Sequence, residues 1–142
     1  MGSEWEADTT AAGVWAERRS PSLSDIEALA AEAFAALPEE FRALCGEIVI
    51  RIDEWADDET LDALNIRDPL DLMGLFRGAA VTLDPLTGQE ANAIHLYRRA
   101  ILDYWCEREE TLGAVVSHVL IHEIGHHLGL SDSDMAAIEA RA

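Results

Sequence analysis

The sequence contains no lysine, and its ten basic residues, all arginine, stand against 28 acidic residues, so the formal net charge is −18 at pH 7. A charge this negative repels phosphate backbones and anionic lipid headgroups. We therefore expect no nucleic acid and no anionic membrane among the partners, and we expect cationic segments and metal ions to be favoured. The simpler explanation of the acidic excess is that it keeps the protein soluble.

Cysteine and long apolar runs are also scarce. Two cysteines, Cys45 and Cys106, in 142 residues are too few for a disulfide framework. No apolar run approaches the ~18 residues that a membrane-spanning helix needs. The first residues are acidic and do not form a basic-then-apolar secretory leader. These absences predict a cytoplasmic protein with reduced thiols.

The chain has the length and composition of one soluble domain, with 142 residues of which 49% are hydrophobic and 27% charged. Residues 1–20 mix small, polar and charged side chains without a clear period, and we interpret them as a flexible N-terminal arm. Trp5 and Trp15 are unexpected in such an arm, and we expect them to dock on the chain's own surface or on a partner. Residues 21–142 then form a single domain.

Helical and extended patterns are mixed along residues 21–142. Helical spacing and capping residues predict helices over 24–37, 39–44, 57–64 and 99–106, a turn over 69–73, a long helix ending before Gly129, and a terminal helix capped by Ser131. Stretches rich in β-branched residues predict strands over 47–55, within 75–83 and over 93–97. This mixture indicates an α+β fold, with a small mixed sheet packed on helices.

Residues 122–132 (HEIGHHLGLSD) form the stretch with the clearest chemistry. Positions four apart on an α-helix share a face, so the imidazoles of His122 and His126 can hold one Zn²⁺ at about 2.0–2.1 Å. Glu123 lies roughly 100° around the helix, where it can take a proton from a metal-bound water instead of binding the metal. The spacing predicts a catalytic zinc site with Glu123 as general base.

The third ligand is expected after the helix ends. Gly129 can adopt the left-handed conformation that turns the chain, and Asp132, three residues later, can return to the metal. Asp134 and Glu139 compete, and Glu139 would correspond to a layout in which a downstream helix supplies a glutamate. We favour Asp132, because the turn that returns it to the metal would explain why a glycine occupies position 129.

The remaining histidines need separate roles. His118, His122 and His126 form one stripe, but the outer two lie about 12 Å apart along the axis, too far for one metal to bind all three. The pair His118 and His122 would place Val119 where the catalytic carboxylate is needed, so we choose the other pair. His118 is then a supporting, packing or substrate-contacting residue. We expect His127 and His95 to be structural, with a substrate or supporting role as the alternative for His95.

The motif resembles that of the small bacterial zincin-like metallopeptidases, H-E-x-x-H-x-x-G-x-x-D. The matching positions are His122, Glu123, His126, Gly129 and Asp132. Residues 75–78 and 94–99 are similar to the family's upstream segments, and the resemblance extends from about Ser24 to the C-terminus. It implies a compact minimal zincin-like domain with one Zn²⁺ per chain, bound by His122, His126 and Asp132, and with Glu123 as general base.

The resemblance implies a zinc metallopeptidase that hydrolyses peptide bonds of a peptide or protein substrate. Zincin folds pair an extended substrate with an edge strand, a role we assign to residues 93–97 or 79–83. Tyr97, Arg98 or His118 would help to stabilise the oxyanion. Compared with H-E-x-x-H-x-x-G-x-x-H enzymes, an aspartate replaces the third histidine, which makes zinc a weaker Lewis acid, and no methionine turn is evident.

Two other functions stay open at this stage. A zinc-binding regulatory or protein-interaction module of the same fold would keep the metal and show little or no hydrolysis. A metal-dependent nuclease would need basic patches, which the net charge of −18 opposes.

Overall fold

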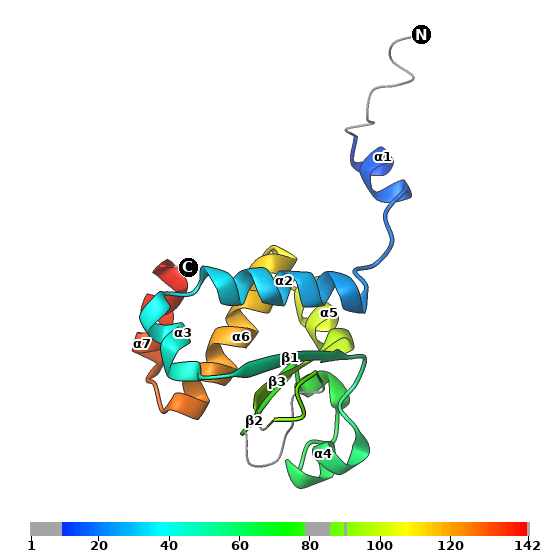
Figure 1. Cartoon of the computed structure of the whole chain (residues 1–142). Helices are drawn as coiled ribbons and strands as arrows, with labels where there is room; N and C mark the ends of the chain where they lie inside the picture. The colour runs from blue at the N-terminus through cyan, green and yellow to red at the C-terminus, as the bar shows by residue number, and fades with distance from the viewer. Residues whose placement is uncertain (1–9, 79–85, 90, 142) are drawn as a thin grey trace.

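The computed structural model describes residues 10–78, 86–89 and 91–141. The elements, in chain order, are α1 (Ala11–Ala16), α2 (Leu23–Ala36), α3 (Glu39–Cys45), β1 (Ile48–Asp53), α4 (Asp58–Ala63), the 3₁₀ turn η2 (Pro69–Asp71), β2 (Gly74–Arg77), β3 (Asn92–Tyr97), α5 (Arg98–Cys106), α6 (Leu112–Leu128) and α7 (Asp132–Arg141) (Figure 1). The α+β fold predicted from the sequence is confirmed, and the predicted helices of residues 21–142 are all present.

Side-chain caps define where the helices begin. Ser22 and Asp25 form a reciprocal capping box at the start of α2, in which Ser22 Oγ accepts from the Asp25 amide at 3.1 Å and Asp25 Oδ2 accepts from the Ser22 amide at 2.8 Å. Thr111 caps α6, and Ser131 caps α7 as predicted, with Asp134 returning the bond. Each cap satisfies amides that a helix start leaves without partners.

The sheet has the strand order β1-β3-β2, with β1 parallel and β2 antiparallel to β3. The prediction that residues 93–97 form the edge strand for substrate is wrong, because they belong to the central strand β3. A strand with neighbours on both sides has no free edge for a peptide. The alternative segment, 79–83, lies outside the described residues. Among the described strands, the antiparallel edge is β2, which packs against α6.

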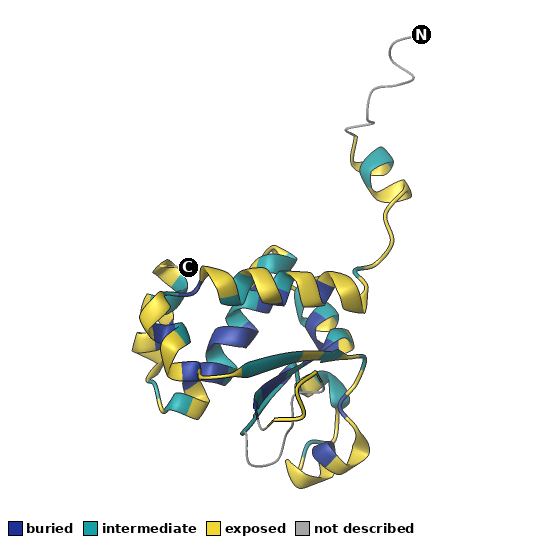
Figure 2. Cartoon of the chain, in the orientation of Figure 1, coloured by how far each residue is buried: buried dark blue, intermediate teal, exposed yellow. Residues whose placement is uncertain are grey.

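The core lies between α6 and the sheet, and its other walls are α2, α5 and α7. The buried side chains of α6 are aliphatic, and Figure 2 shows the buried positions recurring along this helix. Alternate residues of β3 face opposite sides of the sheet. Ile94 and Leu96 pack in the main core with α6, whereas Tyr97 belongs to a second cluster with Ala56 and Leu61 near α4. Within the described ranges, none of the helices combines the length and hydropathy that a bilayer crossing requires.

The N-terminal arm contains a helix that its irregular pattern did not predict, α1, which lies away from the rest of the chain (Figure 1). Trp15 is 58% exposed, so the expectation that it docks on the chain's own surface is wrong. Its indole is instead covered by Arg18, whose Cζ lies 5.2 Å from the ring centroid. Trp5 lies outside the described residues. The arm joins the body where Arg98 donates to Pro21 O and to Ser20 Oγ.

Candidate metal centre

Helix α6 ends at Gly129, which has φ 73° and a left-handed conformation. The Gly129 amide donates to His126 O at 3.2 Å and the Leu130 amide donates to Gly125 O at 2.8 Å, so two of the last carbonyls of the helix have partners. The predicted helix end is confirmed. Because ending the helix already explains this glycine, its presence does not favour Asp132 over another carboxylate as third ligand.

The turn after Gly129 sends α7 back along α6, and Gly125 controls how closely the helices approach. A Cβ atom placed on Gly125 would lie 2.7 Å from Cγ of Met135 and closer still to its Sδ, whereas the glycine lets that side chain pack directly on α6. Met135 is fully buried there. Glu139 follows it by four residues and therefore lies on the same face of α7, one turn further along α6.

Three donor atoms meet where Glu139 reaches α6. Glu139 Oε1 lies 2.9 Å from His118 Nδ1 and 3.0 Å from His122 Nε2. The two imidazoles are neighbours, with ring centroids 4.0 Å apart and planes inclined by 34°. Among the residues that the structure describes, this is the one set of three metal-ligating side chains whose donor atoms all lie within 4.8 Å of one another.

The carboxylate oxygen at the centre of this group is left without a hydrogen bond. Glu139 Oε1 is buried, and no donor in the described part of the chain meets hydrogen-bond geometry with it, although two ring nitrogens lie close by. Leaving a buried carboxylate oxygen unsatisfied is costly, and a cation held by all three atoms would remove the cost. Two imidazoles and a carboxylate are also a ligand set that Zn²⁺ commonly takes in proteins. The group therefore fits a zinc ion.

Of the three metal ligands predicted from the sequence, only His122 belongs to this group. His126 lies one turn further along α6, with its ring edge-on to His122 at a centroid distance of 6.0 Å. Two imidazoles that share a metal at about 2 Å have centroids roughly 5 Å apart, so a small movement would let this pair bind one ion. Asp132 is the exposed first residue of α7 and does not belong to the group, and Asp134 is engaged in the cap with Ser131.

The group includes two residues that were not predicted as the favoured ligands. His118 was expected to support, to pack or to contact substrate, and Glu139 was one of the competitors of Asp132. The 118/122 spacing equals the 122/126 spacing, so the sequence already contained the signal for a second histidine pair. What it did not contain was the approach of α7, which brings a carboxylate to that pair.

Glu123 lies on the side of α6 that faces the sheet. Its Cγ lies 3.3 Å from the position that a Cβ on Gly74 would take, so the carboxyl side chain packs beside the first residue of β2. Burial raises the pKa of Glu123, and the nearby His126 opposes the shift. A raised pKa makes the ionised carboxylate a better proton acceptor near neutral pH. Position and pKa therefore both suit a general base.

The residues with expected structural or helper roles fall elsewhere. His127 is exposed, and its ring stacks on Phe76 of β2 with centroids 3.7 Å apart and planes 19° apart, so the predicted core position is wrong. Arg98 donates to Glu54 and to the chain at Ser20 and Pro21, so its guanidinium is bound at the arm junction and the predicted oxyanion role is wrong. Tyr97 belongs to the buried cluster near α4, apart from the core that contains α6.

Comparison with known protein families shows to which family the chain belongs. A family model described as zincin-like metallopeptidase matches residues 45–142, from the end of α3 through α7. The chain belongs to the zincin-like metallopeptidase family. No curated protein matches the chain. The zinc that the family implies has a fitting ligand set within the matched residues, since His118, His122 and Glu139 all lie there.

Proposed function

We propose that the protein is a zinc metallopeptidase that binds one Zn²⁺ per chain through His122, His126 and a carboxylate of α7, with Glu123 as general base. The observation that carries the proposal is the placement of Glu123, next to His122 on α6 and buried beside edge strand β2. When bound, zinc supplies Lewis acidity that polarises the substrate carbonyl and makes water more acidic. The family supports this class of chemistry.

Glu123 provides the proton transfers in this proposal. Its carboxylate accepts the proton of the attacking water and returns it to the leaving amine nitrogen. Burial favours both steps, because a raised pKa lets the same carboxyl hold the proton between them. As metal ligands, His122 and His126 would hold the ion on the adjacent face of α6. The base, Glu123, directly follows the ligand His122 in the sequence and so lies beside that face.

Strand β2 is our proposal for the substrate-binding edge. It pairs with β3 on one side only among the described strands, and its first residue, Gly74, contacts the helix beside Glu123. An extended peptide added to this edge would receive main-chain hydrogen bonds and run past the general base. We propose peptide or protein substrates with cationic segments, which suit the net charge of −18.

Two carboxylates of α7 compete for the third ligand position. Asp132 follows the family pattern of the sequence, whereas Glu139 Oε1 lies 3.0 Å from His122 Nε2. The short distance favours Glu139, since binding a metal there requires the smaller movement.

One observation supports a second function, a zinc-binding regulatory or interaction module with little hydrolysis. His118, His122 and Glu139 already form a compact ligand set. A zinc ion there would be displaced by one turn from the position beside Glu123, and the residue that follows His118 is the buried, aliphatic Val119. Such a site would fasten α7 to α6 but would have no proton acceptor next to the metal.

Three variants separate the two functions, each assayed for bound zinc per chain and for cleavage of a peptide library. For a peptidase, Glu123→Gln retains zinc and loses turnover by about 10²-fold or more, His126→Ala loses zinc and turnover, and His118→Ala keeps most of both. For the alternative, His118→Ala loses zinc, His126→Ala keeps it, and no variant or wild type cleaves. Undiminished cleavage by Glu123→Gln would refute the assigned base.

A further inference from the structure

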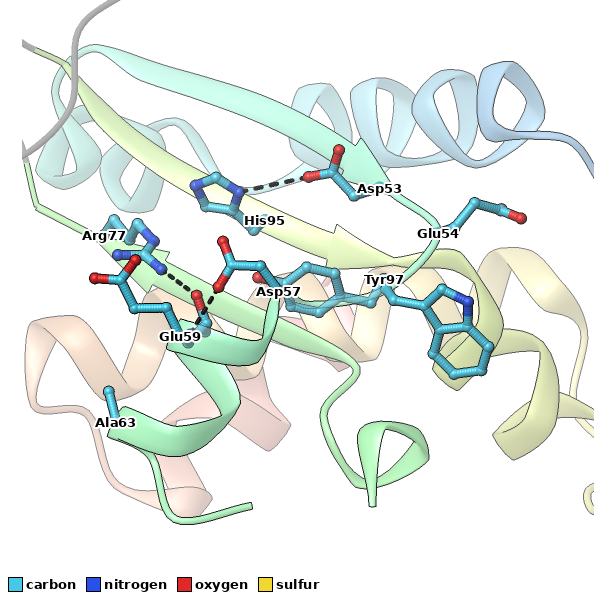
Figure 3. Close-up of a pocket in the computed structure, with 10 residues that line it drawn as sticks. Asp53, Glu54, Asp57, Glu59, Ala63, Arg77, His95 and Tyr97 are labelled. Atoms are coloured by element: carbon cyan, nitrogen blue, oxygen red, sulfur yellow. Dashed lines mark hydrogen bonds and ion pairs between the residues drawn. The ribbon is translucent and has the colours of Figure 1, made fainter. Parts of the chain in front are cut away.

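A large open cavity lies on the face of the sheet that α6 does not cover. Its volume is about 760 Å³, and Figure 3 shows its lining residues. They come from the end of β1 and the turn that follows it, from α4, from the end of β2, and from the second half of β3. His95 and Tyr97 project into it from β3, whereas their neighbours Ile94 and Leu96 point to the core around α6. The sheet therefore lies between this cavity and the candidate metal centre, although the charge of Glu123 is among those that act on Tyr97.

The charges that line the cavity are mostly negative. The four acidic residues of the lining are Asp53, Glu54, Asp57 and Glu59. Glu54 is paired with Arg98 and Arg99, at 3.0 Å and 3.1 Å. The one arginine among the described lining residues, Arg77, donates to Thr60 Oγ1 at 2.7 Å. Hydrogen bonding with Thr60 lowers the pKa of Asp57, and the charge of Arg77 adds to this. Asp53 and Glu59 have no arginine paired with them among the described residues.

One polar atom in the wall is buried without a partner, and a hydroxyl faces the cavity beside it. Tyr97 lines the cavity and is 3% exposed as a residue, and no hydrogen bond of its hydroxyl is found among the described residues. His95 Nε2 is buried without a partner among the same residues, while Nδ1 faces Asp53 Oδ2 at 3.9 Å. Burial and the charge of Arg77 lower the pKa of His95, so the ring is neutral at neutral pH. With its proton on Nδ1 toward Asp53, the ring leaves Nε2 as an acceptor that needs a donor.

An aromatic surface lies at the same cavity. Trp55 is 45% exposed, and the Cζ atom of Arg99 lies 5.8 Å from the centroid of its ring. The chain therefore already places one guanidinium group over this indole, which is a favourable contact for a planar cation.

We propose that this cavity binds the guanidinium group of an arginine side chain from a peptide or protein partner. Guanidinium is a donor-only group, and it matches a wall that offers the carboxylates of Asp53 and Glu59, the unpartnered His95 Nε2 and the Tyr97 hydroxyl oxygen. Its planar fork also pairs with carboxylates and stacks on indole better than an ammonium group does. The site does not depend on zinc, so its binding does not rest on the proposed peptidase activity.

The test is fluorescence anisotropy with a labelled peptide that has blocked termini and arginine at two positions, compared with the same peptide carrying citrulline. The cavity double variant, Asp53→Asn/Glu59→Gln, removes two carboxylates from the lining. The charge-matched control, Glu27→Gln/Glu109→Gln, removes the same charge from exposed positions elsewhere. Tyr97→Phe removes only the hydroxyl. Circular dichroism checks that each variant folds, and Glu123→Gln protein, with and without zinc, separates binding from catalysis.

We expect the arginine peptide to bind at least tenfold more weakly to the cavity double variant than to the wild type, and several-fold more weakly to Tyr97→Phe. The charge-matched control and Glu123→Gln should bind like the wild type. Equal weakening in both double variants would show attraction by net charge alone and overturn the proposal. Equal binding of the citrulline peptide would also overturn it.

Discussion

Glu139 on α7 and His122 on α6 lie 3.0 Å apart, measured from Oε1 to Nε2, although they belong to different helices. The contact exists because Met135, one turn earlier on α7, packs into the space that Gly125 leaves on α6. A glycine without chemistry of its own thus decides which carboxylate reaches the histidines.

The third ligand can be identified by comparing two conservative variants. We expect Glu139→Gln to weaken zinc binding by tenfold or more, because it removes the anionic oxygen that lies against His122. Asp132→Asn should change zinc affinity much less, because Asp132 is exposed at the start of α7. Competition titration with a chromogenic chelator measures both. The reverse ranking would assign the ligand to Asp132.

Gly125→Ala should loosen α7. The new methyl group would overlap with Met135, and we expect a loss of about 1–3 kcal/mol in the free energy of unfolding. Zinc affinity should fall as well, because Glu139 moves with α7. Gly113→Ala is the matched control, since its Cβ would meet only Leu29 Cδ2 at 3.8 Å. Urea unfolding of both variants gives the comparison, and equal stabilities would contradict the packing argument.

Gly74→Ala should impair catalysis more than metal binding. A Cβ at this position would lie 2.9 Å from Val119 Cγ1, which has to move, and 3.3 Å from Cγ of Glu123, the proposed general base, which is pressed by a few tenths of an ångström. We expect lower kcat with unchanged zinc content. A methyl group on Gly78 meets nothing within 4 Å among the described residues, and Gly78→Ala should behave like the wild type. Steady-state kinetics on any cleaved peptide decide this, and a normal kcat for Gly74→Ala would place Glu123 outside the reaction.

The stability of the metal-free protein should fall at mildly acidic pH because of His95. Burial and the charge of Arg77 lower its pKa in the folded state, with Asp53 opposing them and Arg51 adding to them. The unfolded chain therefore takes up this proton first, at about pH 6.5. The contribution of neutral His95 to stability is present above that pH and is lost as the pH falls through the folded pKa.

His95→Gln removes this titration. Urea unfolding at pH 7.5 and at pH 5.5, in the presence of a chelator, should show a smaller loss of stability for the variant than for the wild type. The other four histidines are common to both proteins and cancel in the difference. An identical pH dependence would mean that His95 is not held neutral by its surroundings.

Most local structure could be predicted because its causes are local. Gly129 ends α6 and Ser131 caps α7, as their positions in the sequence indicate. The strand expected over residues 47–55 is β1, and the turn expected after Asp68 is η2. Each of these depends on a residue's own backbone preferences or on a partner three or four positions away.

The order of the strands and the composition of the metal group could not be predicted in the same way. Residues 93–97 have a strand pattern whether they lie in the centre or at the edge, so only the pairing of β3 with both neighbours placed them. Likewise, the spacing of His118, His122 and His126 offers two equivalent pairs. The packing of α7 on Gly125 is what brings Glu139 to the first of them.

The stripe of His118, His122 and His126 means that one imidazole belongs to both possible ligand pairs. An ion bound by either pair would leave the other pair incomplete, so under the two functions proposed above the loss of His118 or of His126 would decide which position can bind. No change of fold would separate the two.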